Sequence, residues 1–399
     1  MKRNICFPDY SNSIMNLSCS VMQAFGAKPK HPALKHKCLN NIEKKENVIF
    51  IILDGLGVNI LSAYERNNPG SFLAKNKKAE ISSVFPPTTS TAITTFRTAE
   101  SPIEHGIVGW SLYFKELGTA IDLLPMTDSI TNAQLLGSEY PTMKYLGVRS
   151  IGDIIHTKDN KVRCYDIMPT EHKGSYYNTE ASKGFIQVAC PSFRKMMEKV
   201  AALSKKSGRK LISAYTPYPD RALHREGLKG KNINRVIANI EREIKKLSKR
   251  LEGTSSVLII TADHGLIDCK KIININDHPK LMECMILPKF PESRFVSFFI
   301  KDDKKRQFEK EMKKFRKDFI VMTRKEFFRK GLLGPGRKHH KIDDFIGDYV
   351  AIGIGGAQIK QHYPQSEGHD LIAHHAGLTR DEMIVPLIVI DFEKNQKKA

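Results

Sequence analysis

Residues 48–57, VIFIILDGLG, and residues 257–265, VLIITADHG, are two apolar runs that each end in an acidic residue and a glycine. Aliphatic and β-branched runs without alternating polar positions are typical of strands that are buried on both faces of a parallel sheet. Residues 211–216 and 385–390 have the same character. Strands over 48–53, 211–216, 257–261 and 385–390 therefore predict an α/β protein with buried parallel strands.

Helical patterns lie between these strands. From Lys231 to Leu251 the apolar residues recur every three or four positions with charged residues between them, which predicts an amphipathic helix lying on a sheet. A second helix is expected over residues 303–317. Weaker strand patterns cover residues 79–85, 295–300 and 349–354. Strands alternating with helices favour a three-layer α/β sandwich with a mostly parallel central sheet.

Two stretches fit this alternation poorly and are interpreted as inserted cap segments. Residues 111–205 are rich in glycine, proline, tyrosine and aspartate, and residues 285–345 combine a strand, a very basic helix and a glycine-containing loop. The catalytic core is therefore expected to comprise residues 1–110, 206–284 and 346–392. The two insertions are expected to form the walls of the substrate site.

Composition excludes several classes of protein. The 399 residues are 41% hydrophobic and 27% charged, which argues against extensive disorder, and no apolar run approaches the roughly 20 residues of a membrane span. The seven cysteines are scattered and form no CxxC pair, so we expect reduced thiols and a cytoplasmic protein. The net charge of +21 favours an anionic partner, but the basic residues are too dispersed for a dedicated nucleic-acid module.

Polar residues able to bind a metal follow three of the predicted strands. Asp54 follows the first strand, Asp263 and His264 follow another, and Asp220 and His224 stand four residues apart after the third. In an open α/β sheet, ligands bind beyond the carboxyl ends of the strands. Carboxylates and imidazoles without a thiolate suit zinc, and manganese less well. A divalent metal site is therefore predicted at this edge of the sheet.

Two further segments complete the candidate site. After Pro86-Pro87, the hydroxyl-rich run of residues 88–95 predicts a helix, whose N-terminus would favour an anion and a deprotonated hydroxyl. Near the C-terminus, His369, His374 and His375 cluster just before the last predicted strand. Three histidines so close together are more than packing usually requires.

At these five ordered motifs, from about residue 48 to residue 390, the sequence resembles the alkaline phosphatase superfamily, and within it the type I phosphodiesterase/nucleotide pyrophosphatase family. The resemblance implies an alkaline phosphatase-like fold and two bound metal ions, usually zinc. It assigns one metal to three residues together with the oxygen of the nucleophile, and the second metal to three others. These residues are Asp54, Asp263 and His264 for the first, and Asp220, His224 and His375 for the second.

The resemblance also assigns the third histidine ligand and the nucleophile. Family members place the histidine directly before a small residue and glycine, which selects His375, with His374 as the nearest competitor. Counting back nine positions from Thr98-Ala99 selects Thr89 as nucleophile, whereas alignment on the preceding Phe-Pro would select Thr88.

The family's phosphate-binding asparagine is replaced here by Trp110, which is expected to contact the substrate. His105 and Gly106 match the family pattern and are expected to shape a turn. Tyr113, Tyr176 and Tyr177 are candidates for stacking on a nucleotide base.

Together these features predict a metal-dependent hydrolase of phosphodiester or pyrophosphate bonds in nucleotide-like substrates, acting through a phosphothreonine intermediate. A phosphomonoesterase or phosphomutase on the same scaffold is the enzymatic alternative. From another class, the chain could be a basic nucleic-acid-binding module without catalysis. Metal content separates these readings, because only the hydrolases need the complete set of ligands.

Overall fold

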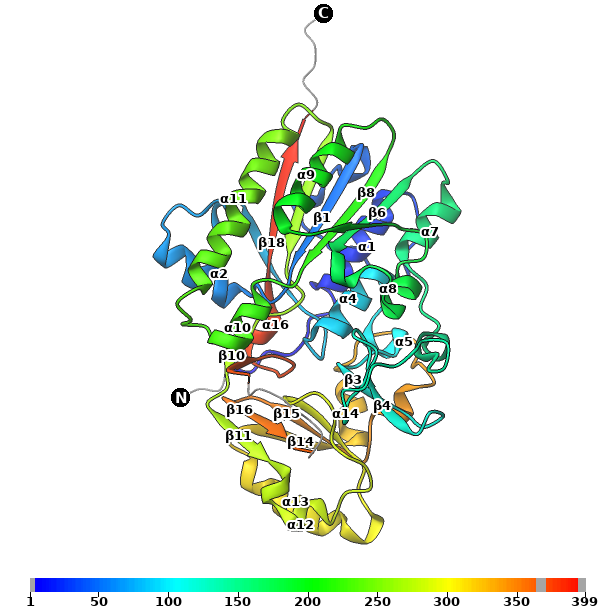
Figure 1. Cartoon of the computed structure of the whole chain (residues 1–399), viewed down its shortest axis with the longest axis vertical. Helices are drawn as coiled ribbons and strands as arrows, with labels where there is room; N and C mark the ends of the chain where they lie inside the picture. The colour runs from blue at the N-terminus through cyan, green and yellow to red at the C-terminus, as the bar shows by residue number, and fades with distance from the viewer. Residues whose placement is uncertain (1–3, 364–370, 394–399) are drawn as a thin grey trace, which may run out of the picture.

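The computed structural model describes residues 4–363 and 371–393, and its centre is a seven-stranded sheet. The strands lie in the order β2-β18-β9-β1-β8-β6-β7 (Figure 1). Their bounds are β1 (Asn47–Leu53), β2 (Lys77–Ser82), β6 (Arg163–Pro169), β7 (Ile186–Cys190), β8 (Lys210–Thr216), β9 (Ser256–Thr261) and β18 (Ile384–Phe392). Each of the four strongest predicted strands is present, and every residue of β1 and β9 is buried.

The last strand runs against the others, so the prediction that it is parallel was wrong. β1 pairs parallel with β8 and β9, and β6 pairs parallel with β7 and β8, whereas β18 is antiparallel to both β9 and β2. The short β17 (Ala373–His374) pairs with β10 (Ile267–Asp268), which comes soon after β9. The chain therefore enters β18 from the carboxyl edge and must run back across the sheet. An apolar run alone does not distinguish the two directions.

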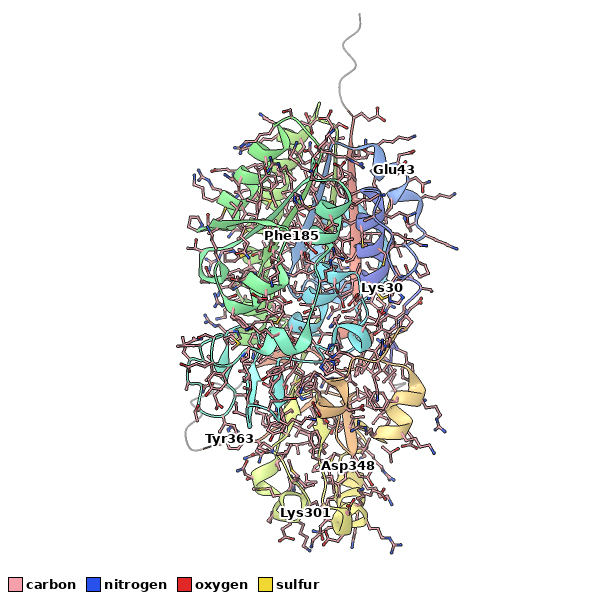
Figure 2. The ribbon with its side chains drawn as sticks, turned by 90° about the vertical axis from the view of Figure 1, so that its right-hand side faces the viewer. Lys30, Glu43, Phe185, Lys301, Asp348 and Tyr363 are labelled. Atoms are coloured by element: carbon pink, nitrogen blue, oxygen red, sulfur yellow. The ribbon has the colours of Figure 1, made fainter. Side chains whose placement is uncertain are left out.

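Helices cover both faces of this sheet and make the three layers. α9 and α11 pack on each other on one face, while α1 packs on α4 and α4 on α7 on the other (Figures 1 and 2). The bounds are α1 (Ile14–Ala24), α4 (Thr89–Thr98), α7 (Ile151–Lys158), α9 (Phe193–Ser204), α10 (Asp220–Glu226) and α11 (Ile233–Leu251). α11 is the amphipathic helix predicted from residue 231, and it buries the apolar stripe that the spacing indicated.

Residues 111–205 are only in part a segment outside the sheet, contrary to expectation. The antiparallel strands β3 (Ser111–Phe114), β4 (Thr119–Asp122) and β5 (Thr127–Asp128) form a small separate sheet, but β6 and β7 extend the central one. β6 was not predicted as a strand because a buried charged residue interrupts its apolar pattern. Asp166 lies inside this strand and pairs with Arg97 Nη1 at 2.8 Å, so the apolar pattern is interrupted.

A second, antiparallel sheet lies below the central one in Figure 1 and has the order β12-β13-β15-β14. Its strands are β12 (Phe290–Pro291), β13 (Phe295–Phe298), β14 (Phe319–Thr323) and β15 (Tyr349–Gly353). The predicted helix over 303–317 forms as α13 (Lys305–Met312) between two short 3-10 turns, and it packs on this sheet. Residues 346–392 were expected to belong entirely to the catalytic core. β15 lies in this range but pairs with β13 and β14, so it is part of the second sheet.

No helix in the described parts of the chain has both the length and the apolar character needed to cross a bilayer.

Candidate active site

The carboxyl ends of three adjacent strands bring the three candidate aspartates together. β1 lies between β8 and β9, and Asp54, Asp220 and Asp263 follow these strands. Backbone hydrogen bonds continue past the strand ends, because Asp54 N donates to Thr216 O at 3.1 Å and Asp220 N donates to Asp54 O at 3.0 Å. Parallel register thus gathers three residues that are far apart in the sequence.

Gly55 allows this close approach. Its φ is +72°, and a Cβ atom there would lie 2.7 Å from Leu266 and 2.8 Å from Cβ of Asp220. Its backbone N–H donates to Oδ1 of Asp263 at 3.0 Å. A larger residue would separate the loops that carry two of the aspartates, so glycine is required here by both conformation and space.

The first group of potential ligands is Asp54, Asp263 and His264, whose ligand atoms lie within 4.8 Å of one another. Nε2 of His264 is 3.5 Å from Oδ1 of Asp54 and 3.4 Å from Oδ2 of Asp263. All three side chains are buried. The structure brings together the set that the sequence assigned to one metal.

The second group is Asp220, His264 and His375, again within 4.8 Å. His224 borders this group, with Nε2 3.2 Å from Oδ2 of Asp220 and its ring centroid 5.1 Å from that of His375. His264 lies between the two groups, since its ring stacks on His375 at 3.9 Å. The second set assigned from the sequence therefore converges too, with His264 nearer to Asp220 and His375 than the assignment implied.

Backbone carbonyl groups set the tautomers of two histidines. Nδ1–H of His224 donates to Ala373 O at 2.7 Å, and Nδ1–H of His264 donates to Gly265 O at 3.2 Å. In both rings Nε2 then faces the carboxylates. Such a carbonyl partner is the usual support of an imidazole that binds a metal.

Several buried oxygen and nitrogen atoms of this site lack hydrogen-bond partners among the described residues, and this tests whether divalent ions fit. Oδ1 of Asp54, Oδ1 of Asp220, Oδ2 of Asp263 and Nδ1 of His375 are buried, and none has a hydrogen-bond partner among the described residues. Buried polar groups are normally satisfied. Four unsatisfied donor atoms converging from three carboxylates and an imidazole are the chemistry that a divalent cation would satisfy.

The pKa shifts of the candidate ligands also indicate that this site would be stabilised by bound cations. Burial, then Asp263 and Asp220, raise the pKa of Asp54 well above its usual value, and burial also raises the pKa of Asp263. Burial, then His264 and His224, lower the pKa of His375 well below its usual value. Ionised carboxylates and neutral imidazoles crowded together are costly without added positive charge, which is what bound cations would supply.

Two adjacent threonines at the start of α4 differ in their contacts. Oγ1 of Thr89 lies 3.2 Å from Nε2 of His264, whereas Oγ1 of Thr88 donates to Oε1 of Glu292 at 2.7 Å. Thr88 is the N-cap residue, but its side chain does not cap the helix. The N–H groups in the first turn of α4, which begins at Thr89, have no partner within the helix. Because the Thr88 side chain does not accept from them, they can donate to a bound anion.

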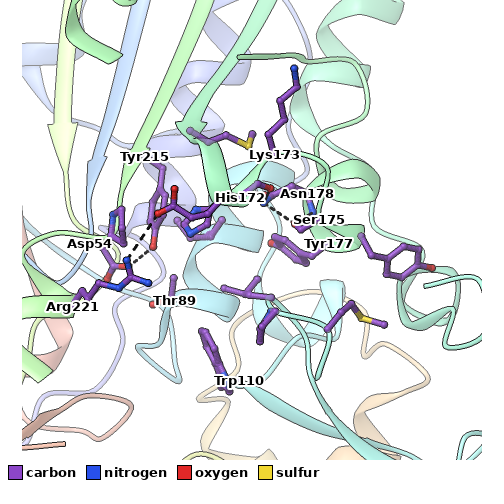
Figure 3. Close-up of a pocket in the computed structure, with 18 of the residues that line it drawn as sticks. Asp54, Thr89, Trp110, His172, Lys173, Ser175, Tyr177, Asn178, Tyr215 and Arg221 are labelled. Atoms are coloured by element: carbon purple, nitrogen blue, oxygen red, sulfur yellow. Dashed lines mark hydrogen bonds and ion pairs between the residues drawn. The ribbon is translucent and has the colours of Figure 1, made fainter. Parts of the chain in front are cut away.

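These groups open into a cavity of about 1210 Å³. Figure 3 shows Asp54 and Thr89 at one side, Trp110 below them and Tyr177 farther along the cavity. His172, Lys173 and Arg221 also line the cavity, with Arg221 beside Asp54 (Figure 3). Residues of the central sheet, of the 111–205 segment and of the second sheet all line this cavity, which is large enough for a nucleotide-sized ligand.

The aromatic residues predicted to contact the substrate differ in position. Trp110, Tyr176 and Tyr177 line the cavity, whereas Tyr113 stacks on Phe290 at 6.0 Å and does not. The backbone N of Trp110 donates to Oε1 of Glu292 at 2.8 Å, and its side chain lines the cavity.

The other histidines of the sequence prediction have separate positions. His374 lines the cavity but belongs to neither group of ligands, and its Nδ1 contacts Ser293 Oγ at 3.2 Å. Nδ1 of His105 accepts from Ile107 N at 3.1 Å, as expected for a turn-shaping residue. His369 lies outside the described residues.

Three residues at the site escaped the sequence analysis. The hydroxyl of Tyr215, on β8, donates to Oδ2 of Asp54. Glu292 enters from the turn between β12 and β13, and Arg221 follows Asp220 directly on α10 (Figure 3). Nη1 of Arg221 lies 3.9 Å from Oε1 of Glu171. Tyr215 is the next-to-last residue of a predicted strand, and Arg221 lies between Asp220 and His224, so their positions carried a signal, whereas nothing in the sequence marked Glu292.

The fold is shared with solved structures of low sequence identity. Murine ectonucleotide pyrophosphatase/phosphodiesterase 5, in an inactive form in complex with AMP, is 17% identical with a TM-score of 0.59, and the match covers 86% of this chain and 87% of that chain. The human protein of that name is 16% identical, with a TM-score of 0.59 and coverage of 86% and 87%. Phosphonoacetate hydrolase from Sinorhizobium meliloti 1021, in complex with phosphonoformate, is 16% identical, with a TM-score of 0.61 and coverage of 89% and 92%.

Family membership rests on the sequence model. A comparison with curated proteins found no match. The family model described as type I phosphodiesterase/nucleotide pyrophosphatase matches residues 48–377, which include all the candidate ligands and Thr89. The chain is thus an enzyme that hydrolyses phosphoric esters, and it belongs to the type I phosphodiesterase/nucleotide pyrophosphatase family.

Proposed function

We propose that this enzyme hydrolyses phosphodiester or pyrophosphate bonds of nucleotide-like substrates with Thr89 as nucleophile and two divalent metal ions, most suitably zinc, as cofactors. The observation that carries the proposal is the contact of 3.2 Å between Thr89 Oγ1 and His264 Nε2, beside buried carboxylate oxygens that lack partners among the described residues. Asp54, Asp263 and His264 would hold one ion, and Asp220, His224 and His375 the other.

The reaction takes two displacements at phosphorus. Oγ1 of Thr89 attacks, the Oγ–P bond forms, and the bond between phosphorus and the leaving oxygen breaks to give a phosphothreonine. Water then attacks from the opposite side, breaks the Oγ–P bond and restores the hydroxyl. Bound divalent ions would lower the pKa of the attacking group and offset the charge that develops on the leaving oxygen. Two inversions predict net retention of configuration at phosphorus.

The residues of this chain hold the reacting groups in place. The N–H groups at the start of α4 would donate to an anion bound at Thr89. The hydroxyl of Tyr215 orients Asp54 through its hydrogen bond. Arg221, Lys173 and the ring of Trp110 line the cavity and would contact the remainder of an anionic substrate. The AMP bound to the murine neighbour and the phosphonoformate bound to the bacterial one support an anionic phosphorus ligand.

The nucleophile is tested by comparing the two threonines at the start of α4. Thr89→Ala should abolish turnover and the labelled phosphoenzyme while two zinc ions per chain remain bound, as measured by elemental analysis. Thr88→Ala is the matched control, because its hydroxyl contacts Glu292 instead of His264, and it should retain most activity. Full activity of Thr89→Ala would refute the proposal.

The metal content of the purified protein would distinguish a metal-dependent hydrolase from a nucleic-acid-binding module without catalysis. The purified protein should contain close to two zinc or manganese ions, and a chelator should remove activity that added metal restores. A protein without metal that bound DNA in a salt-sensitive manner would instead be a nucleic-acid-binding module.

A further inference from the structure

Glu292 brings a carboxylate from the second sheet into the cavity that contains Thr89. It lies in the turn between β12 and β13, and its side chain lines this cavity. Oε1 accepts hydrogen bonds from Oγ1 of Thr88 at 2.7 Å and from the backbone N of Trp110 at 2.8 Å. These two bonds to one oxygen fix the carboxylate beside the N-terminus of α4. Its donor Thr88 directly precedes Thr89, the proposed nucleophile.

The other oxygen is free for the ligand. Oε2 of Glu292 accepts no hydrogen bond from any described residue, and it is not among the fully buried unpaired atoms. Because the side chain lines the cavity, this oxygen remains available to a bound substrate. Burial raises the pKa of Glu292, while the hydrogen bonds from Thr88 and Trp110 and the positive charge of Lys289 act in the opposite direction and favour the ionised form.

A carboxylate in this position opposes negative charge on the substrate. Asp54, Asp220 and Asp263 carry three negative charges, and two divalent ions would bring four positive ones. Glu292 adds a fourth negative charge to these three carboxylates and so lowers the positive potential that a bound anion would meet. A phosphodiester carries one negative charge, whereas a terminal phosphate carries about −1.5 to −2 at pH 7. The additional charge and the third unesterified oxygen of a monoester would meet Oε2.

We propose that Glu292 is a specificity-determining residue that selects phosphodiesters and internal pyrophosphate linkages over terminal phosphomonoesters. The inference rests on the proposed function of the Thr89 site and names its substrate class. Like charges a few ångströms apart in a partly buried site interact strongly enough to change binding by roughly tenfold or more. The cationic side chains that line the cavity thus attract an anionic substrate, while the Glu292 carboxylate limits the negative charge that this substrate can carry.

Glu292→Gln is the direct test, because the amide oxygen can still accept from Thr88 and Trp110 while the charge is lost. We expect the ratio of kcat/KM for bis-p-nitrophenyl phosphate to that for p-nitrophenyl phosphate to fall at least about tenfold. Binding gives a second readout that does not depend on turnover. Inorganic phosphate should bind the zinc-loaded variant about tenfold more tightly by calorimetry, whereas dimethyl phosphate should bind as it does to the wild type.

Two further variants control for charge and for folding. Glu171→Gln removes a negative charge from the same cavity, but this side chain is 56% exposed and pairs with Arg221 at the rim, so the ratio should stay unchanged. Glu292→Asp keeps the charge but withdraws the carboxylate by one methylene group, so the ratio should fall, and by less than in Glu292→Gln. It keeps the inference testable if Glu292→Gln does not fold.

The outcomes separate the inference from the function on which it rests. If the wild type hydrolyses the diester but Glu292→Gln changes neither the ratio nor phosphate binding, the role of Glu292 is wrong and the proposed function stands. If the wild type hydrolyses no diester, the proposed function fails, and a preference for monoesters would overturn the inference as well. Equal changes in Glu171→Gln and Glu292→Gln would also overturn it, because they would reflect net charge alone.

Discussion

Arg294 and Glu382 form a fully buried ion pair that joins the second sheet to the segment carrying His375. Nε of Arg294 donates to Oε1 of Glu382 at 2.6 Å, and Nη2 donates to Oε2 at 2.9 Å. Glu382 also accepts from the backbone N of Gly377 at 2.8 Å. The pair therefore fixes the position of the loop between β17 and β18, on which a candidate metal ligand lies.

Glu382→Ala should destabilise the protein by about 3–5 kcal/mol, because it leaves the guanidinium of Arg294 buried without its counter-charge. Urea unfolding followed by circular dichroism measures the loss. Glu198→Ala is the control, since Glu198 pairs with Arg194 on the surface and its removal should leave the unfolding midpoint almost unchanged. Equal midpoints for wild type and Glu382→Ala would show that the buried pair is not needed.

Tyr215→Phe should weaken metal binding about tenfold to a hundredfold, because it removes the hydroxyl that orients Asp54. Competition with a chromophoric chelator measures the zinc affinity. Tyr177→Phe also removes a buried hydroxyl near the cavity, but one that contacts Thr94 at 2.7 Å, so its zinc affinity should match the wild type. Similar losses in both variants would argue against a specific role of the Tyr215 hydroxyl.

Asp54→Asn should stabilise the metal-free protein while it abolishes tight metal binding. Burial, then Asp263 and Asp220, raise the pKa of Asp54 well above its usual value, so its charge is unfavourable in the absence of cations. The thermal midpoint of the variant in chelator should exceed that of the wild type in chelator, and added zinc should no longer raise it. A lower midpoint in chelator would contradict this account.

His105 should make stability fall in acid. Burial, then His339, lower the pKa of His105 from 6.5 to about 3, so between these values the unfolded chain binds a proton that the folded chain does not. Stability therefore rises with pH across this window and is lost as the pH falls from 6.5 towards 3, by about 1.4 kcal/mol per pH unit for one proton.

His105→Gln, unfolded in urea with chelator at several pH values, should show a shallower pH dependence below pH 6.5 than the wild type. The exposed His156 provides the control, and His156→Gln should follow the wild-type curve. If His105→Gln had the wild-type slope, the acid sensitivity would come from other groups.

Most of the central sheet and its longest helix could be predicted from the sequence because their patterns are local. Buried strands such as β1 and β9 are continuous apolar runs, and the spacing from Lys231 to Leu251 predicted α11, so both could be identified without knowledge of their neighbours. β6 could not be identified in this way. Its Asp166 is tolerated inside the sheet only because Arg97, distant in sequence, pairs with it.

The direction of β18 shows the same limit. Its apolar run predicted a buried strand, but the choice between parallel and antiparallel depends on where the preceding segment lies, which the pairing of β17 with β10 decides.

By itself the sequence determined the class of fold, the family and the residues that converge beside Thr89, because strand ends and short motifs record local requirements. Only the tertiary structure decided that His264 lies between both groups of ligands, that Thr88 faces Glu292 and that Tyr215 supports Asp54. These are contacts between side chains from separate elements, and they depend on packing distances that no spacing along one chain specifies.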